Sequence, residues 1–162
     1  CDTDFVGTDG TLGGKYKDAT ALAATIAASW GEGEADRYVV LTGGEPMLQV
    51  DDALIDALHA QGFIIAIESN GTFAVPRRID WICISPKAGS ELVQTSGDEL
   101  KLVWPQPGSD VARFATLDFG HLLVQPLDDP NAAANVQACI ELVMEDPRWR
   151  LSLQAHKSLG LR

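Results

Sequence analysis

Short apolar runs, some of them separated by helical segments, are the feature of this sequence that most constrains its fold. Within the 162 residues these runs are YVVL, FIIAI, WICI, ELKLV, HLLV and RLSL. Apolar runs of this length are typical of strands that are covered on both faces, as in parallel sheets. Each run is far shorter than the ~20 residues that a membrane-spanning helix requires. The runs therefore predict six strands of a buried sheet.

Apolar residues at helical spacing predict four helices, over residues 18–31, 50–62, 111–115 and 132–145. The side chains predicted to face the core from these helices are Leu22, Ile26 and Trp30, then Leu54, Ile55 and Leu58, and last Val136, Ile140, Val143 and Met144. Strands that alternate with helices imply a parallel α/β sheet with right-handed crossovers. The fold class predicted from the residues is therefore α/β.

The charge and the cysteines of the chain bear on what it binds and where it acts. Twelve basic and 23 acidic residues give a net charge of −11, which repels nucleic-acid phosphates and anionic lipid. Its three cysteines are an odd number, and no signal-like segment is visible. Cys83 lies inside an apolar run and Cys139 on the inward face of a helix, so both are predicted to be buried thiols. We therefore expect a cytoplasmic protein without nucleic-acid or membrane partners.

Polar clusters follow five of the six apolar runs. In chain order they are TGGEP, ESNG, SPK, QPLDD and QAHK. The carboxyl ends of parallel strands lie on one side of the sheet, where ligands bind in open α/β sheets and in barrels. Turn chemistry is a sufficient explanation for any single cluster. Five in succession favour a binding site along one rim.

The first of these clusters indicates which kind of ligand the site takes. Gly43 and Gly44 let a ligand approach the backbone closely, and Glu45 supplies a carboxylate for a cationic amine. A phosphate-binding loop would carry a Lys followed by Ser or Thr after its glycines, whereas Glu45 and Pro46 stand here. An amino-acid-like ligand therefore fits better than a nucleotide phosphate.

Three segments together resemble the radical S-adenosylmethionine enzymes, and most closely their 7-carboxy-7-deazaguanine synthase (QueE) family of the queuosine pathway. They are CDTDFVG at the start, TGGEP in the middle and QAHKSLGLR at the end. TGGEP alone is shared across the superfamily, and SPK, QPLDD and the HK tail narrow the resemblance. It implies a single domain over residues 1–162, folded as an incomplete parallel TIM-like β/α barrel. The first barrel strand and most of the cluster loop are expected upstream of Cys1.

The resemblance also implies cofactors and the residues that hold them. In this family three cysteines bind a 4Fe-4S cluster, and Cys1 resembles the last of them. Thr3 resembles a threonine that binds Mg2+ together with the substrate, although a backbone hydrogen bond beside Asp2 and Asp4 is an equal alternative. The implied contacts to S-adenosylmethionine are Gly43, Gly44 and Glu45 at the methionyl end, Glu68, Ser69 and Asn70 along the ribose, Ser85, Pro86 and Lys87 near the carboxylate or ribose, and Gln125, Pro126, Leu127 and Asp128 near the adenosine.

The activity implied by the resemblance is that of a carbon–nitrogen lyase. It converts 6-carboxy-5,6,7,8-tetrahydropterin to 7-carboxy-7-deazaguanine with loss of ammonia. Its implied pterin contacts are Thr42, Gly44, His156 and Arg162. An electron donor such as flavodoxin or ferredoxin and a second copy in a homodimer are the implied partners. The alternatives are a glycyl-radical activating enzyme, which acts on a partner protein, and a non-catalytic α/β module that binds a small ligand.

Other ionisable residues have simpler interpretations. His59 lies among polar residues of its helix and is expected to be solvated, and His121 is expected to be structural. Asp128 and Asp129 could form a pair of metal ligands, yet adjacent acidic residues in a turn after a strand more often cap the next helix.

Overall fold

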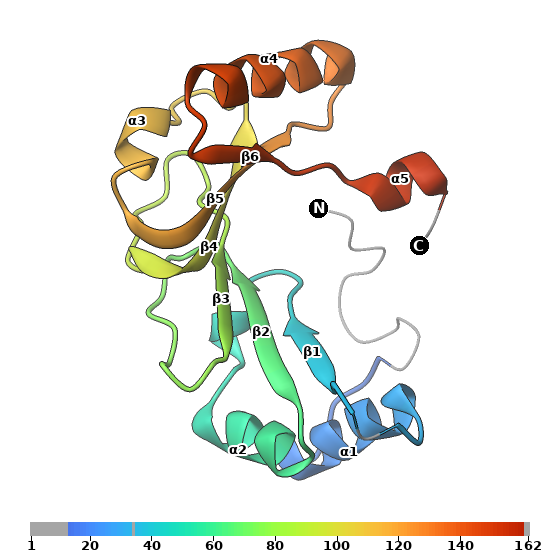
Figure 1. The fold of residues 1–162 in the computed structure, drawn as a ribbon. Coiled ribbons are helices and arrows are strands. Elements are labelled where there is room, and N and C mark those ends of the chain that lie inside the picture. The colour runs from blue at the N-terminus through green and yellow to red at the C-terminus, as the bar shows by residue number, and fades with distance from the viewer. Residues whose placement is uncertain (1–12, 34, 161–162) are drawn as a thin grey trace. The chain divides into compact units, whose positions relative to one another are not determined.

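The computed structural model describes residues 13–33 and 35–160, and its helices and strands follow one another as Figure 1 shows. The strands are β1 (Tyr38–Leu41), β2 (Ile64–Ser69), β3 (Trp81–Ile84), β4 (Ser96–Trp104), β5 (Asp118–Pro126) and β6 (Trp149–Leu151). The helices are α1 (Ala19–Trp30), the 3-10 helix η1 (Pro46–Leu48), α2 (Asp52–Ala60), α3 (Val111–Phe114), α4 (Ala132–Glu145) and α5 (Ala155–Leu159). Among these described helices, none has the length and apolar character needed to cross a membrane.

The strand order confirms the predicted fold class. The six strands follow the order β1-β2-β3-β4-β5-β6, and every pair whose register is described is parallel. Within the described residues, β1 and β6 stand at the two ends of this order. The fold is therefore α/β with an all-parallel sheet that does not close, consistent with an incomplete barrel.

The chain divides into two compact units. The first contains the described residues up to Glu68 together with Pro76–Asp80, and the second contains Ser69–Val75 and the residues from Trp81 onward. That residues 1–162 form a single domain stays a prediction.

The core of the first unit forms where α1 packs against α2. Asp18 caps α1 by accepting a hydrogen bond from the Ala21 N–H at 2.9 Å, and Asp51 caps α2 in the same way from Leu54 at 2.9 Å. The buried residues of α2 are Leu54, Ile55 and Leu58, as predicted.

The residue that α1 buries differs from the prediction. Ala23 is 1% exposed, whereas Trp30, predicted to lie in the core stripe, is 42% exposed. The alanine-rich face lets α1 approach its neighbours closely, and the indole of Trp30 lies at the last turn, edge-on to Phe63 with ring centroids 6.1 Å apart.

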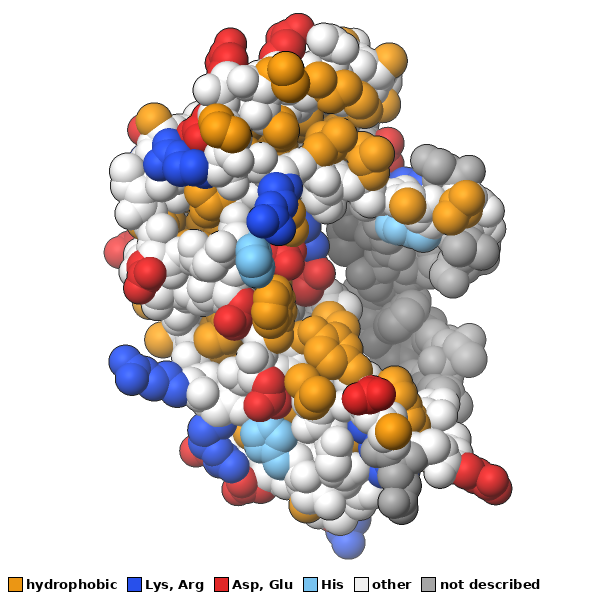
Figure 2. Space-filling view, viewed as in Figure 1, with side chains coloured by type: hydrophobic (Ala, Val, Ile, Leu, Met, Phe, Trp, Pro, Cys, Tyr) orange, Lys and Arg blue, Asp and Glu red, His pale blue; other side chains and the backbone are white. Residues whose placement is uncertain are grey.

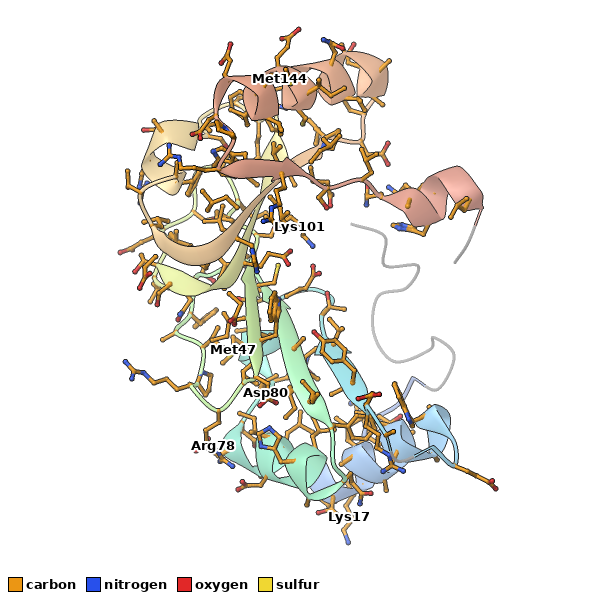
Figure 3. All side chains as sticks on the ribbon, viewed as in Figure 1. Lys17, Met47, Arg78, Asp80, Lys101 and Met144 are labelled. Carbon is orange, nitrogen blue, oxygen red and sulfur yellow. The ribbon has the colours of Figure 1, made fainter. Side chains whose placement is uncertain are left out.

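The core of the second unit lies between α4 and strands β4, β5 and β6. Cys139 is fully buried in it, and Asn135, one turn earlier, is also buried. These two residues fix the rotation of α4, so Ile140 and Met144, predicted to face inward, lie outward, with Met144 80% exposed. Figure 3 shows Met144 on the outer side of α4.

Strand β4 shows that the sheet of the second unit has two unlike faces. Leu100 and Leu102 are 0% exposed and belong to the core under α4. Glu99 and Lys101, which alternate with them, are half-buried. Successive side chains of a strand point to opposite faces. The expectation that this strand is covered on both faces therefore holds in full only for the face of Leu100 and Leu102.

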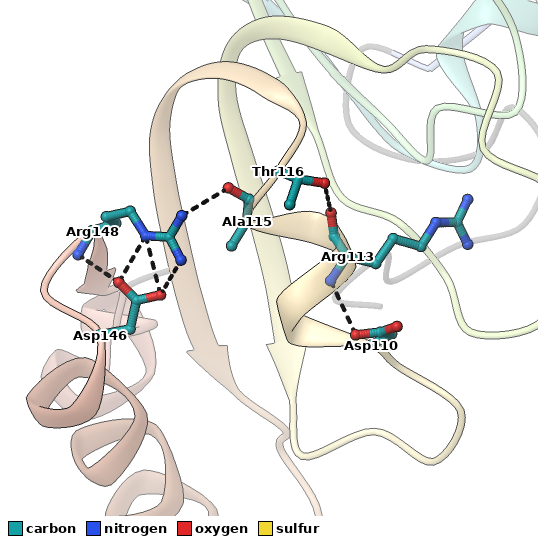
Figure 4. Close-up of polar contacts among 6 residues, drawn as sticks. All are labelled: Asp110, Arg113, Ala115, Thr116, Asp146 and Arg148. Atoms are coloured by element: carbon teal, nitrogen blue, oxygen red, sulfur yellow. Dashed lines mark hydrogen bonds and ion pairs between the residues drawn. The ribbon is translucent and has the colours of Figure 1, made fainter.

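A polar network joins the turn after α4 to α3 (Figure 4). The guanidinium of Arg148 donates to the carboxylate of Asp146, at 2.9 Å from Nε and 2.6 Å from Nη2, and to the carbonyl of Ala115 at 3.2 Å. The pKa of the Asp146 carboxyl is lowered, first by the hydrogen bond from Arg148. In α3, Asp110 accepts from the Arg113 N–H at 3.0 Å and caps the helix. These contacts hold the turn that precedes β6 against the C-terminal end of α3.

Candidate functional site

The TGGEP segment follows β1 at the carboxyl end of the first unit's strands. Leu41, the last residue of β1, pairs in register with Ile67, and Thr42 and Glu68 are the residues that follow this pair in the sequence. Gly43 and Gly44 have φ angles of 86° and 58°, which L side chains rarely adopt, and their backbone is exposed. Among the described residues, no atom comes within 4 Å of a Cβ built on either glycine. Within that part of the chain, side chains therefore leave the backbone of this loop accessible.

Glu45 has a structural role that sequence reasoning missed. Its Oε1 accepts a hydrogen bond from the Met47 N–H at 3.0 Å and thereby caps η1. Pro46, the first residue of η1, is buried. A carboxylate has about four lone-pair positions, and the cap of η1 occupies one of them. The cap fixes the rotamer of the side chain.

The polar residues after β2 build a tight turn in the second unit. The hydroxyl of Ser69, 2% exposed, accepts from the Gly71 N–H at 3.0 Å. The Oδ1 of Asn70 accepts from both the N–H and the hydroxyl of Thr72, at 2.9 and 2.7 Å. The observed role of Ser69 and Asn70 is therefore to shape this turn.

The SPK segment is attached directly to that turn. The Ser85 N–H donates to the Ser69 carbonyl at 2.8 Å, so the two segments lie side by side within the second unit. Lys87 Nζ donates to the Ser85 hydroxyl at 3.3 Å and is otherwise exposed, while Pro86 is buried. Two of the predicted clusters, ESNG and SPK, are therefore brought together.

The QPLDD segment is held by a buried amide. Leu127 N–H donates to the Trp104 carbonyl at 2.8 Å. Asn135 Nδ2 donates to the Leu127 carbonyl and to Asp129 Oδ1, both at 2.8 Å, and Asp129 Oδ1 also accepts from the Asn131 N–H at 2.7 Å. Asp129 thus binds the residue that precedes α4, whereas the expected side-chain cap of this helix is not formed. Gln125 and Pro126 remain half-buried at the end of β5.

Asp128 is bound to the C-terminal segment. Its carboxylate forms an ion pair with Lys157 of α5. The sequence did not predict α5, which contains His156 next to Lys157. The pair therefore joins the segment that carries His156 to the loop that follows β5.

Three predicted site residues, Cys1, Thr3 and Arg162, lie outside the described residues. The prediction for the other two cysteines is confirmed, because Cys83 and Cys139 are both free and buried. Burial raises the pKa of the Cys139 thiol to about 11. In the part of the chain that the structure describes, no three His, Cys, Asp or Glu side chains are grouped so that they could hold a metal ion.

Sequence reasoning missed a row of polar residues on the second unit's strands. Cys83 on β3, Glu99 on β4 and His121 on β5 are level in register, and Cys83 Sγ lies 3.4 Å from Glu99 Oε1. The His121 ring stacks on Trp81, with centroids 5.8 Å apart and an interplanar angle of 21°. The polar residues at every second position of ELKLV were the available signal.

His59 and Asp80, in the first unit, form a hydrogen-bonded pair away from the carboxyl ends of the strands. His59 Nε2 lies 3.0 Å from Asp80 Oδ2, which also accepts from the Ile65 N–H at 2.8 Å. Burial raises the pKa of the Asp80 carboxyl, but these hydrogen bonds outweigh it and leave that pKa below its usual value. The expected solvated His59 therefore has a structural partner.

A cavity of about 360 Å³ in the first unit is lined by Arg37, Ala60, Gln61 and Gly62. Arg37 precedes β1 and Gly62 precedes β2, so this cavity lies at the amino ends of the strands. Ligands of parallel α/β folds bind at the carboxyl ends. The cavity is therefore not the candidate site.

Comparison with known proteins decides the family. No family model matches the chain. The 7-carboxy-7-deazaguanine synthase of Bradyrhizobium diazoefficiens is 60% identical over 162 residues, which are 100% of this chain and 77% of that protein. This chain belongs to the 7-carboxy-7-deazaguanine synthase family.

Further members of the family match over nearly the same length. Those of Burkholderia multivorans and Caulobacter vibrioides are 58% and 57% identical, each over 99% of this chain and 77% of the relative. The crystal structure of QueE from Escherichia coli has a TM-score of 0.62 and 28% identity, and the match covers 84% of this chain and 63% of that one. The chain is therefore an enzyme of the 7-carboxy-7-deazaguanine synthase kind, and neither alternative function is favoured.

Proposed function

We propose that this protein converts 6-carboxy-5,6,7,8-tetrahydropterin to 7-carboxy-7-deazaguanine, with loss of ammonia, as a radical S-adenosylmethionine enzyme of queuosine biosynthesis. The observation that carries the proposal is the 60% identity to a 7-carboxy-7-deazaguanine synthase over the whole chain. S-adenosylmethionine and a 4Fe-4S cluster are the cofactors that such a family implies. When bound, they supply the 5′-deoxyadenosyl radical that takes a hydrogen atom from the pterin.

The TGGEP segment fits the methionyl end of S-adenosylmethionine. The open backbone of Gly43 and Gly44 allows close approach, and the capped carboxylate of Glu45 offers an acceptor in a fixed position. A charge-assisted hydrogen bond from the methionyl amine to Glu45 would orient the cofactor. Glu68, which follows Ile67, the partner of Leu41, would accept from a ribose hydroxyl.

The second unit supplies the other proposed cofactor contacts. Asn70, in the turn that Ser69 shapes, would lie along the ribose. Ser85, Pro86 and Lys87 would bind near the carboxylate or ribose, and Lys87 supplies the cation there. The residues proposed for the adenosine end are Gln125, Pro126, Leu127 and Asp128, whose loop the buried Asn135 amide holds in shape.

The pterin and the two metal groups involve residues outside the described part of the chain. We propose Thr42, Gly44, His156 and Arg162 as contacts to the pterin, with Thr3 binding Mg2+ beside the substrate carboxylate. Cys1 would be one of three thiolates on the cluster. Because Cys83 and Cys139 are buried core thiols, neither fits as its partner.

The proposed partners follow from the family resemblance, and the proposed location follows from the chemistry of the thiols. A flavodoxin or ferredoxin would deliver electrons, and two copies would form a homodimer. The two free buried cysteines accord with a reducing cytoplasm.

The proposal is tested by turnover. The protein, expressed at the full length of its gene, is reconstituted anaerobically with iron and sulfide and given S-adenosylmethionine, a reductant and the carboxylated pterin. Chromatography should show 7-carboxy-7-deazaguanine and 5′-deoxyadenosine. If 5′-deoxyadenosine is absent, the radical reaction is refuted. If it forms without deazaguanine, the substrate assignment is wrong.

A pair of variants tests the placement of Glu45. Glu45→Gln keeps an oxygen that can cap η1 but removes the negative charge, whereas Glu45→Ala removes both. Because a hydrogen bond to a charged group contributes about 1.5–3 kcal/mol, both variants should bind S-adenosylmethionine roughly 10- to 100-fold more weakly. Pterin affinity should change much less. Equal losses for both ligands would contradict this placement.

A further inference from the structure

We propose that Gln106 is a positioning residue for S-adenosylmethionine binding, whose side-chain amide holds the exposed turn that begins at Lys87. This role rests on the proposed function, in which the SPK segment contacts the cofactor. It concerns the second unit alone, and follows from the hydrogen bonds between the loop that joins β3 to β4 and the loop that joins β4 to α3.

The loop between β3 and β4 is fixed at both of its ends. At its start, the Ser85 N–H donates to the Ser69 carbonyl at 2.8 Å. At its end, the N–H groups of Val93 and Gln94 donate to the Gly71 carbonyl at 2.8 and 3.0 Å. Both ends are therefore attached to the turn that follows β2.

The middle of the same loop forms a separate turn over residues 87–90, the Lys87 turn. The Ser90 N–H donates to the Lys87 carbonyl at 3.2 Å, and Gly89 has a φ of 79°, a value that glycine adopts readily at the third residue of a turn. All four residues are exposed, so packing does not fix them. The turn's own hydrogen bond leaves the N–H of its second residue, Ala88, to a partner outside it.

Gln106, in the loop between β4 and α3, supplies that partner. Its Oε1 accepts from the Ala88 N–H at 2.9 Å. Among the described residues, no other hydrogen bond joins the Lys87 turn to a different loop or strand. The position of the turn therefore depends on this one side chain.

Gln106 is itself held in place before it meets the Lys87 turn. Its carbonyl accepts from the Ser109 N–H at 3.1 Å, and the Ser109 hydroxyl donates to its Oε1 at 3.5 Å. It follows Pro105, whose ring fixes the backbone φ, and it is half-buried where Ala88 is exposed. The amide oxygen is therefore a fixed point to which the exposed turn is attached.

The Lys87 turn matters for binding because Lys87 supplies the cation of the proposed SPK contact. On the face that Figure 2 shows, the described Lys and Arg side chains lie singly or in small groups among acidic and neutral ones. In a chain of net charge −11, an anionic group is then held by the placement of individual cations. A turn that is already in place loses less conformational entropy when the cofactor binds.

The test uses the full-length, cluster-loaded enzyme. Gln106→Leu removes the acceptor at similar volume, whereas Gln106→Glu keeps an acceptor oxygen at the same length. Gln137→Leu is the matched control, since Gln137 is an exposed residue of α4 whose Nε2 donates to Glu141 Oε1 at 3.2 Å. Four quantities are measured for each protein: the dissociation constant for S-adenosylmethionine, the KM for the pterin at saturating S-adenosylmethionine, the hydrogen exchange of peptides that span residues 86–91, and the urea midpoint.

We expect Gln106→Leu to weaken S-adenosylmethionine binding about 2- to 10-fold, the effect of one hydrogen bond between neutral groups. Its peptides over residues 86–91 should exchange faster than those of the wild type, while the KM for the pterin and the urea midpoint stay unchanged. Gln106→Glu should lie closer to the wild type than Gln106→Leu in both affinity and exchange. Gln137→Leu should match the wild type throughout.

Three results would overturn the role of Gln106. The first is an unchanged affinity for S-adenosylmethionine in Gln106→Leu. The second is an equal loss in Gln106→Glu, because the acceptor oxygen is then not the cause. The third is a loss for both ligands together with a lowered urea midpoint, because Gln106 then acts only on stability.

The failure of the proposed function gives a different result. If wild-type enzyme binds S-adenosylmethionine but makes no deazaguanine, the reaction is wrong, and affinity and hydrogen exchange still decide the role of Gln106. If wild-type enzyme turns over and Gln106→Leu matches it in affinity, only the role of Gln106 is refuted.

Discussion

Among the described glycines, Gly71 is the one whose replacement the structure penalises most clearly. It follows the Ser69–Asn70 turn with a φ of 77°, and a Cβ there would lie 2.5 Å from Leu92 Cδ1 and 2.7 Å from Ile84 Cγ2. Its carbonyl accepts from the N–H groups of Val93 and Gln94, at 2.8 and 3.0 Å. The turn is therefore tied down and cannot move to make room for a methyl group.

The loss of folding free energy expected for Gly71→Ala has two parts. Placing an L residue in the left-handed region costs about 1–2 kcal/mol. Forcing a methyl group into filled space costs about 1–3 kcal/mol more. Gly89 offers the matched control in the same unit, because its φ is 79° and no atom of residues 13–33 or 35–160 lies within 4 Å of its Cβ position. Gly89→Ala should therefore lose only the first part.

Urea unfolding, followed by tryptophan fluorescence and circular dichroism, measures both variants. With a urea dependence of about 1–3 kcal/mol per molar for small proteins, the midpoint of Gly71→Ala should lie roughly 1 M below that of Gly89→Ala. Equal midpoints would refute the reasoning, because they would show that Leu92 and Ile84 yield to the methyl group without loss of packing.

Three further predictions concern buried or paired polar groups. Asn135→Ala leaves the Leu127 carbonyl without its amide partner and should lower the free energy of unfolding by about 1–3 kcal/mol in the same urea assay, whereas an unchanged value would contradict the anchoring role. The Asp80 pKa is lowered in the folded state, so its contribution to stability is present above the unfolded pKa and is lost as pH falls through the folded pKa. Urea midpoints from pH 6 to pH 2.5 should therefore fall more steeply for wild type than for Asp80→Asn. Parallel curves for the two proteins would contradict a stabilising role of the Asp80 carboxylate. The Cys139 thiol, with its pKa raised to about 11, should react with iodoacetamide at pH 8 only after denaturation. Peptide mass mapping measures the labelling, and a labelled Cys139 after brief exposure of the native protein would contradict this prediction.

The positions of the strands could be predicted from the sequence because they depend on local pattern. YVVL and WICI are bounded by turn-forming or polar residues, and both are strands over the predicted residues. The two-faced character of β4 was also present in the sequence, as the alternation of Glu99 and Lys101 with Leu100 and Leu102. Apolar content outweighed that alternation in the prediction, and the polar face of the sheet was missed.

The rotation of α4 about its axis and the presence of α5 could not be predicted, because both depend on contacts between residues that are distant in the sequence. On α4, the spacing of Ile140 and Met144 suits a core stripe as well as that of Cys139 does, and the buried amide of Asn135 decides between them. Helix α5 spans five residues, too few for a stable isolated helix, and its pair with Asp128 is distant in sequence.

The candidate site also has features that the sequence predicts and features that it does not. That polar clusters follow the strands at their carboxyl ends was predictable from strand direction alone. The cap that Glu45 provides for η1 and the burial of Ser69 in its own turn were not, because both depend on how the loops fold back on themselves. Sequence therefore located the loops, and the structure shows which atoms in them are already engaged.

The two unlike faces of β4 divide its residues between two kinds of evolutionary constraint. Substitutions at Leu100 or Leu102 should be selected against for their effect on folding, whatever ligand the enzyme meets. Those at Glu99 or Lys101, whose half-buried side chains lie on the other face, should disturb the core under α4 much less. Mutational tolerance along this strand should therefore rise and fall with a period of two residues, and a change of substrate could be acquired on one face while the other holds the fold constant.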